Sequence, residues 1–225
     1  MPRIIDLTMP IEDHFRWPVG RELAADFARG DLFQITRLTF GVHGFTHMDS
    51  PRHILPDGPT TSEIPLEATV GDAAVVDLSD VAPNEAIGAE RLRAAAGHVG
   101  RGDRMVFRTA WERQRSPRTA EFWTEAPYLT RDAAEWLLER GVRTVAYDFP
   151  QDYTIRLLLR GEVRPMAEHV THDVLLRNGV VMIEYLSNTA ALTRPRTWLC
   201  ALPLKVPGAD GAPARVIAVE EEEDR

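Results

Sequence analysis

Residues 43–53 read His43-Gly44-Phe45-Thr46-His47-Met48-Asp49-Ser50-Pro51-Arg52-His53. This stretch holds three of the chain's seven histidines and one aspartate within eleven residues. Imidazole and carboxylate are side chains that bind zinc, manganese and similar divalent ions. The composition of the stretch therefore predicts a metal site.

The spacing within the stretch indicates its local conformation. His43, His47, Asp49 and His53 are separated by four, two and four residues, and all three intervals are even. Side chains on an extended segment alternate faces with a period of two, so an extended conformation points all four to one side. A helix would swing the aspartate away from the first two histidines. We therefore expect a strand edge or an extended loop that carries a divalent ion.

Length and composition are those of an ordinary globular protein. The chain has 225 residues, 44% hydrophobic and 27% charged, which suits one domain with a substantial core. The net charge is −8, and the segment 220–225 alone supplies −4. The mildly acidic body argues against nucleic acid as a partner and favours a small-molecule substrate. We expect one domain over residues 1–219 and a solvated acidic tail over 220–225.

The cysteine content and the hydropathy argue against disulfide-bonded, thiolate-cluster and membrane-spanning proteins. Cys200 is the only cysteine, so an intramolecular disulfide and a thiolate cluster are excluded. No stretch approaches the roughly 18 uninterrupted apolar residues typical of a membrane span. The expectation is a cytoplasmic protein without a membrane partner.

Helical and strand patterns alternate from about residue 84 to residue 186, which favours an α/β or mixed α+β fold. The strongest helix is expected over 131–140, between Thr130 as cap and Gly141 as stop. A second helix is expected from Asn84 to Ala96, and a long strand over 32–42. The polar segment 113–127 is predicted to be a loop or flap near the site.

A metal site usually needs ligands from elsewhere in the chain. Glu184 is the one charged residue in the apolar run 180–186, and a buried unpaired carboxylate costs several kcal/mol. It therefore needs a cation, unless the position is an edge where an arginine or solvent reaches it. His172 lies twelve residues earlier on an expected helix, and His169, one turn before it, competes for the same role.

The stretch 43–53 resembles the His-x-Gly-Thr-His-x-Asp-x-Pro-x-His signature of the cyclase family, which includes bacterial kynurenine formamidases and isatin hydrolases. The resemblance extends over nearly the whole chain. The other segments that carry it are 5–8, 55–60, 65–67, 108–111, 141–148, 172–179 with Glu184 behind it, and 201–205.

The resemblance implies a fold and a set of site residues. The fold would be a single α/β domain with a mixed β-sheet core and flanking helices, similar to swivelling β/β/α domains. The implied metal ligands are His43, His47 and Asp49, with His172 and Glu184 either at the same ion or completing a second site that Asp49 bridges. His53 corresponds to the family's general acid/base, a position that could also contact a metal. The implied cofactor is one or two zinc or manganese ions per subunit, and the implied assembly is a homodimer or homotetramer.

Two positions depart from the family pattern. Phe45 stands where glycine is common, which predicts an unstrained backbone and an aromatic ring lining the pocket. Phe149 lies in the segment 148–152, where the family usually has small residues. We expect Phe45, Phe149 and Trp17 to contact the substrate.

The expected reaction is metal-assisted hydrolysis of an amide or ester carbonyl. No Gly-x-Ser-x-Gly motif is present and Cys200 lies in an apolar stretch, so a serine or cysteine nucleophile is disfavoured. The leading substrate is an aryl formamide such as N-formylkynurenine, in the context of tryptophan catabolism. The alternatives are an isatin-like cyclic amide or a lactone, and an inactive homologue that keeps its metal.

Overall fold

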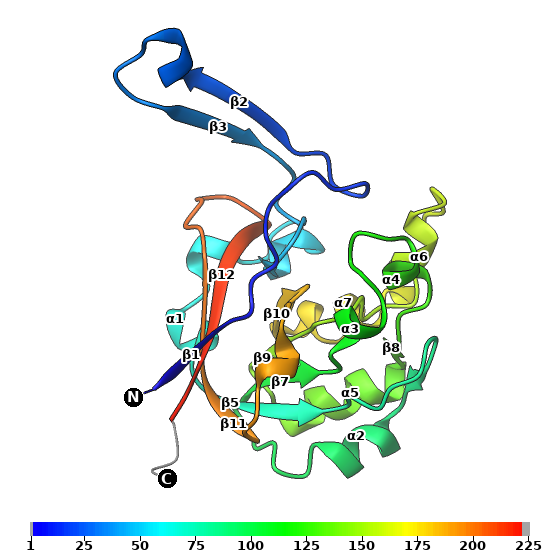
Figure 1. The fold of residues 1–225 in the computed structure, drawn as a ribbon. Coiled ribbons are helices and arrows are strands. Elements are labelled where there is room, and N and C mark those ends of the chain that lie inside the picture. Colours follow the sequence, from blue (N-terminus) through cyan, green and yellow to red (C-terminus); the bar gives the residue numbers. More distant parts are fainter. Residues whose placement is uncertain (1, 222–225) are drawn as a thin grey trace.

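The computed structural model describes residues 2–221, and its centre is one eight-stranded sheet (Figure 1). β12 also pairs with β4, so the sheet closes on itself like a barrel. In spatial order the strands are β1 (Arg3–Asp6), β12 (Gly211–Glu220), β11 (Arg196–Pro203), β5 (Val70–Asp77), β7 (Arg104–Arg108), β9 (Thr144–Ala146), β10 (Val181–Glu184) and β4 (His47–Asp49).

The sheet is mixed, which agrees with the predicted α/β class. β5, β7, β9 and β10 run parallel, and helices lie in the connections between them, as parallel strands require. The other pairings are antiparallel. The helices are α1 (Leu66–Thr69), α2 (Ala89–Ala95), α3 (Trp111–Gln114), α4 (Glu121–Thr124), α5 (Arg131–Arg140), α6 (Ile155–Leu158) and α7 (Val170–Val174).

Each central strand contributes side chains to two cores, because alternate residues face opposite sides of a sheet. In β7, Val106 points into the barrel, where it joins a cluster with Ile183. Met105 and Phe107 point to the other side and pack with residues of α2 and α5. The strands that frame the helical layer are therefore buried on both faces.

The helix predictions had different outcomes. α5 covers 131–140 as predicted, and Gly141 ends it at φ 69°. The helix predicted from Asn84 was wrong at its start, since α2 begins only at Ala89. Asn84 has φ 61°. The intervening residues form β6 (Ala86–Ile87), which pairs with β8 (Tyr128–Leu129), a contact between distant segments that local pattern does not reveal.

Two other segments also differ from expectation. The long strand expected over 32–42 is β3 (Ile35–Thr39), which pairs with β2 (Gly20–Ala25) in a hairpin that projects from the body (Figure 1). The expected loop over 113–127 includes part of α3 and all of α4.

The carboxyl-terminal strand extends into the predicted acidic tail. β12 includes Glu220, whose buried side chain accepts hydrogen bonds from the backbone N–H and hydroxyl of Thr193. Residues 222–225 of that tail lie outside the described part of the chain. Between residues 2 and 221, no helix has the length and hydropathy to cross a membrane.

Phe45 has a left-handed backbone with φ 60°, so the predicted unstrained backbone was wrong. Its ring is 1% exposed and belongs to the core between the sheet and the helices. A non-glycine residue in this conformation costs about 1–2 kcal/mol. Burial of the phenyl ring offsets the cost, since losing a core phenylalanine destabilises a protein by about 3–5 kcal/mol.

This balance predicts an inverted order of stability for two truncations. Phe45→Ala and Phe45→Gly both lose the packing of the ring, but only glycine is released from the left-handed strain. We expect Phe45→Gly to be the more stable by about 1 kcal/mol in urea unfolding. An alanine variant of equal or greater stability would contradict the strain assigned to this position.

Asp148 is a buried carboxylate between β9 and α6. It accepts hydrogen bonds from the backbone N–H groups of Thr109 at 2.9 Å and Ala110 at 2.7 Å, and from the hydroxyl of Thr189. Burial raises its pKa to about 6, even though these hydrogen bonds act in the opposite direction. Asp148 therefore ties three separate segments together at an electrostatic cost.

The raised pKa of Asp148 predicts a specific dependence of stability on pH. Between about pH 4 and pH 6 the folded protein binds this proton more strongly than the unfolded chain, so this contribution to stability falls as pH rises. We expect wild type to gain about 1 kcal/mol over Asp148→Asn when chelator-treated proteins are taken from about pH 7 to about pH 5. Urea unfolding of both proteins measures the difference, and parallel pH profiles would refute it.

Candidate metal centre

The pairing of β4 with β10 brings the first group of predicted ligands together. Glu184 lies opposite His47, and Met182 lies opposite Asp49. Because Met48 points into the barrel core, its two neighbours point to the other face, beside Glu184. His47, Asp49 and Glu184 are all buried, and their ligand atoms lie within 4.8 Å of one another.

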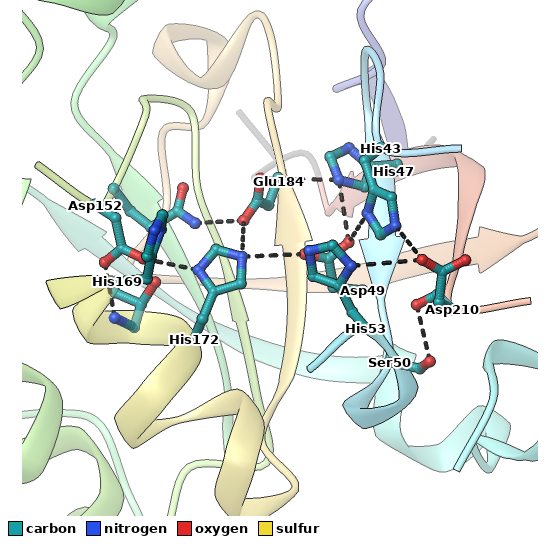
Figure 2. A network of polar contacts seen from close by, with 12 residues as sticks. His43, His47, Asp49, Ser50, His53, Asp152, His169, His172, Glu184 and Asp210 are labelled. Atoms are coloured by element: carbon teal, nitrogen blue, oxygen red, sulfur yellow. Dashed lines mark hydrogen bonds and ion pairs between the residues drawn. The ribbon is translucent and has the colours of Figure 1, made fainter. Parts of the chain in front are cut away.

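α7 delivers a second histidine to the same carboxylates (Figure 2). His172 Nε2 lies 3.6 Å from Asp49 Oδ2 and 3.6 Å from Glu184 Oε1. The Nδ1 atom of His169 instead lies 2.8 Å from the hydroxyl of Thr154. Of the two histidines, the structure thus brings His172, which the resemblance named, to the carboxylates, and it leaves His169 beside Thr154.

Asp49 and Glu184 each face His47 with one carboxylate oxygen and His172 with the other. Asp49 Oδ1 lies 3.1 Å from His47 Nε2, whereas its Oδ2 faces His172. Glu184 likewise directs Oε2 toward His47, at 3.8 Å, and Oε1 toward His172. The cluster thus has two halves that share Asp49 and Glu184, a donor set that fits one divalent ion or two.

His43 and His53 complete the cluster from outside the strand. His43 Nδ1 lies 2.7 Å from Asp49 Oδ1. His53 ends the 3-10 helix Pro51–His53, and its ring centroid lies 3.9 Å from that of His43 and 5.6 Å from that of His172. The expected extended conformation holds only for His47–Asp49.

Each of the three imidazoles predicted as ligands has one ring nitrogen engaged outside the cluster. His47 Nδ1 lies 2.9 Å from the carbonyl oxygen of Phe45, His172 Nδ1 lies 2.7 Å from Asp152 Oδ2, and His43 Nε2 lies 2.8 Å from Asp210 Oδ2. A histidine that ligates a metal typically donates its other N–H to such an acceptor, which fixes its tautomer and orientation. The surroundings therefore direct the free nitrogen of each ring toward the carboxylates.

Sequence reasoning missed three residues that support the ligands. Asp152 orients His172, Asp210 contacts His43, and the side-chain amide of Gln151 donates to Glu184 Oε1. Asp210 is 167 residues from its partner, and only the barrel closure brings them together. A weak signal existed for the other two, since both lie in the segment 148–152 that departs from the family pattern.

The electrostatics of the cluster call for a cation. Burial raises the pKa of Glu184, and the charge of Asp49 raises it further. Burial also opposes ionisation of Asp49, but protonated His47 and hydrogen bonds from neighbouring histidines hold its pKa well below the usual range. Burial lowers the pKa of His172, whereas Asp152 and Asp49 raise it well above its ordinary value. Two adjacent buried carboxylates thus draw positive charge to this site, and a divalent ion can supply it.

An aromatic wall lies beside the cluster. The ring of Trp17 lies 5.0 Å from that of Phe45 and 5.2 Å from that of Tyr185, which itself lies 5.5 Å from His47. The structure places Phe149 elsewhere: it is fully buried and packs against Phe107 in the core. Of the three predicted substrate contacts, only Trp17 and Phe45 come near the metal cluster.

The segment predicted as a flap lies next to this wall. Pro117 and Arg118 line a cavity of about 230 Å³ together with His14 and Phe45. His14, to which neither the spacing nor the family resemblance assigned a role, stacks on Trp17 with ring centroids 4.8 Å apart.

Comparison with known proteins shows which family this chain resembles. The family model described as "Putative cyclase" matches residues 5–151. The kynurenine formamidases of Bacillus cereus and Bacillus mycoides are 26% and 27% identical over 220 residues, which cover 95% of this chain and 95% of each relative.

Solved structures agree with the sequence relatives. One described as a potential metal-dependent hydrolase with cyclase activity is 27% identical, with a TM-score of 0.74 over 99% of this chain and 100% of its own. Isatin hydrolase A from Ralstonia solanacearum is 25% identical, with a TM-score of 0.79 over 98% of this chain and 92% of its own. The names of these relatives support the prediction of a hydrolytic enzyme. On the strength of the family match, this chain belongs to the putative cyclase family.

Proposed function

We propose that this protein is a metal-dependent hydrolase that cleaves the C–N bond of an aryl formamide. The observation that carries the proposal is the convergence of His43, His47 and His172 on the buried carboxylates of Asp49 and Glu184. These donors suit zinc and manganese equally, because both accept imidazole and carboxylate ligands.

The chemistry divides between the ligands and His53. His43, His47, Asp49, His172 and Glu184 would hold a divalent ion, which would lower the pKa of water from about 15.7 toward 7 and polarise the carbonyl group. His53, at the partly exposed rim of the cluster, takes the proton of the attacking water and returns it to the leaving nitrogen. The water oxygen bonds to the formyl carbon, the C–N bond breaks, and formate and the aryl amine leave. Such acid/base catalysis contributes about 10²–10⁴-fold.

The aromatic wall beside the cluster and the names of the sequence relatives support an aryl substrate. Trp17 is the half-buried ring of this wall and offers a flat apolar surface, which suits an aryl group. Phe45 and Tyr185 are buried behind it, and Tyr185 lies 5.5 Å from His47. The curated relatives are named kynurenine formamidase, so N-formylkynurenine is the first candidate, with tryptophan catabolism in the cytoplasm as its setting. The likeness to isatin hydrolases favours a cyclic amide as the second candidate.

The test compares wild type with two variants, each supplied with zinc or manganese and assayed on N-formylkynurenine and isatin. We expect turnover of the formamide that chelator abolishes. Asp49→Ala should lose both metal and activity, whereas His53→Ala should keep the metal and lose about 10²-fold or more in kcat. Metal content is measured separately by elemental analysis.

Three results would count against the proposal. Turnover of isatin alone would assign the cyclic-amide alternative. Metal-loaded protein that hydrolyses neither compound would favour an inactive homologue or a lactone substrate. Equal metal loss in both variants would show that His53 is a ligand rather than the acid/base.

We also propose a homodimer as the simplest form of the expected homo-oligomer, formed through the β2–β3 hairpin. Its tip and second strand expose large apolar side chains, with Leu32 85%, Phe33 70% and Phe27 64% exposed. An isolated two-stranded hairpin is marginal in water and needs further packing. An apolar groove of about 540 Å³ lies at its base, lined in part by Leu38 and Phe40. Two-fold pairing buries the arm of each copy against the groove of the other.

Light scattering with size-exclusion chromatography tests this assembly. We expect wild type to elute as a dimer and the double variant Leu32→Glu/Phe33→Glu as a folded monomer, since two charges on each arm oppose burial. Arg21→Glu/Arg37→Glu on the same hairpin serves as the matched control and should remain dimeric. A monomeric wild type would refute the proposal, and a tetramer unaffected by the apolar changes would place the interface elsewhere.

A further inference from the structure

Asp210 is held firmly beside the signature stretch by its backbone. Its carbonyl oxygen accepts hydrogen bonds from the backbone N–H of Ser50 at 3.0 Å and from the Ser50 hydroxyl at 2.9 Å. The next residue, Gly211, pairs with Asp49 where β12 closes the barrel. The position of Asp210 is therefore set by the same strand pairing that sets the ligand Asp49.

Gly211 keeps open the space that lets His43 reach Asp210. A Cβ atom at position 211 would lie 2.5 Å from Cε1 and 2.9 Å from Nδ1 of the His43 ring, closer than real Cβ contacts. Glycine at this point thus lets the imidazole pack directly against the backbone of β12. The close approach places Nε2 of His43 2.8 Å from Asp210 Oδ2.

The same carboxylate oxygen faces a second imidazole. Asp210 Oδ2 lies 3.5 Å from Nδ1 of His53, whose ring is tilted by 33° against the ring of His43 (Figure 2). A carboxylate at this distance favours the tautomer that carries its proton on the facing nitrogen. That leaves the lone pair of His53 on Nε2, on the side of the ring away from Asp210.

We propose that Asp210 is a positioning residue that couples the metal ligand His43 to the acid/base His53. By receiving the Nε2–H of His43 it leaves Nδ1 of that ring for the metal, as outer carboxylates do for ligand histidines. By facing Nδ1 of His53 it fixes the tautomer whose Nε2 can accept the water's proton. The role in proton transfer rests on the proposed hydrolysis, whereas the effects on tautomer and metal affinity do not.

Asp152 provides a matched comparison. It is an outer carboxylate of the same kind, 2.7 Å from Nδ1 of His172. Its described side-chain contacts are with His172 and the backbone N–H of Thr171, and none is with His53. Removing Asp152 therefore perturbs a ligand histidine without touching the acid/base.

The experiment measures tautomer, zinc affinity and rate in wild type, Asp210→Ala, Asp210→Glu and Asp152→Ala. Imidazole ¹⁵N spectra of zinc-loaded protein report the tautomer of each of the seven histidines, with His53→Ala giving the assignment of that residue. We expect both alanine variants to lower zinc affinity about 10–100-fold, as loss of an outer partner does. Only Asp210→Ala should shift His53 away from the Nδ1–H form and lower kcat at saturating zinc with little change in KM. Asp210→Glu should restore part of each effect.

The outcomes separate this inference from the proposed function. His53 nitrogen shifts that are unchanged in Asp210→Ala would overturn the positioning role, whatever the rates. Equal His53 shifts in Asp210→Ala and Asp152→Ala would also overturn it, because they would show a general loosening of the site. A selective His53 shift in a protein that does not hydrolyse N-formylkynurenine would support the positioning role and refute only the proposed substrate.

Discussion

The antiparallel pairing of β4 with β10 is the constraint on which the rest of the site depends. It sets Glu184 opposite His47 and places two carboxylates side by side in a buried environment. Such a pair requires compensating positive charge or the uptake of a proton, and burial together with the charge of Asp49 raises the pKa of Glu184. The two chemically active strands are short, so their register has to be fixed by the apolar alternation around them, with Met48 and Ile183 facing the barrel core.

The pairing of β12 with β4, which closes the barrel, reinforces the pairing of β4 with β10. β12 pairs with β4 on the edge that β10 leaves free, so β4 is hydrogen-bonded on both sides. A rigid strand suits a site whose ligands must be held to within a fraction of an ångström. The same closure carries Asp210 to His43, and the parallel strands on the other side lead to Asp152 and His172. Carboxylates from opposite parts of the fold thus hold two of the cluster's imidazoles.

The strained backbone of Phe45 also contributes to the geometry of the site. The left-handed conformation lies two residues before the start of β4, and the carbonyl of Phe45 accepts a hydrogen bond from His47. The ring that makes this conformation costly also packs against Trp17 at the aromatic wall. One residue therefore connects the orientation of a ligand, the packing of the core and the shape of the proposed substrate site.

The sequence by itself determined the α/β class and the helix over 131–140, because short-range spacing and caps are local properties. Through the family resemblance it also named the residues that the structure gathers into the candidate metal centre. It also indicated the family, through the signature over residues 43–53 and shorter matching segments along the rest of the chain. Only the tertiary structure placed His172 beside the two carboxylates and His169 beside Thr154, moved Phe149 into the core and revealed Asp210 and the exposed hairpin. These outcomes depend on strand register and barrel closure, which join segments more than a hundred residues apart through contacts that no local pattern records.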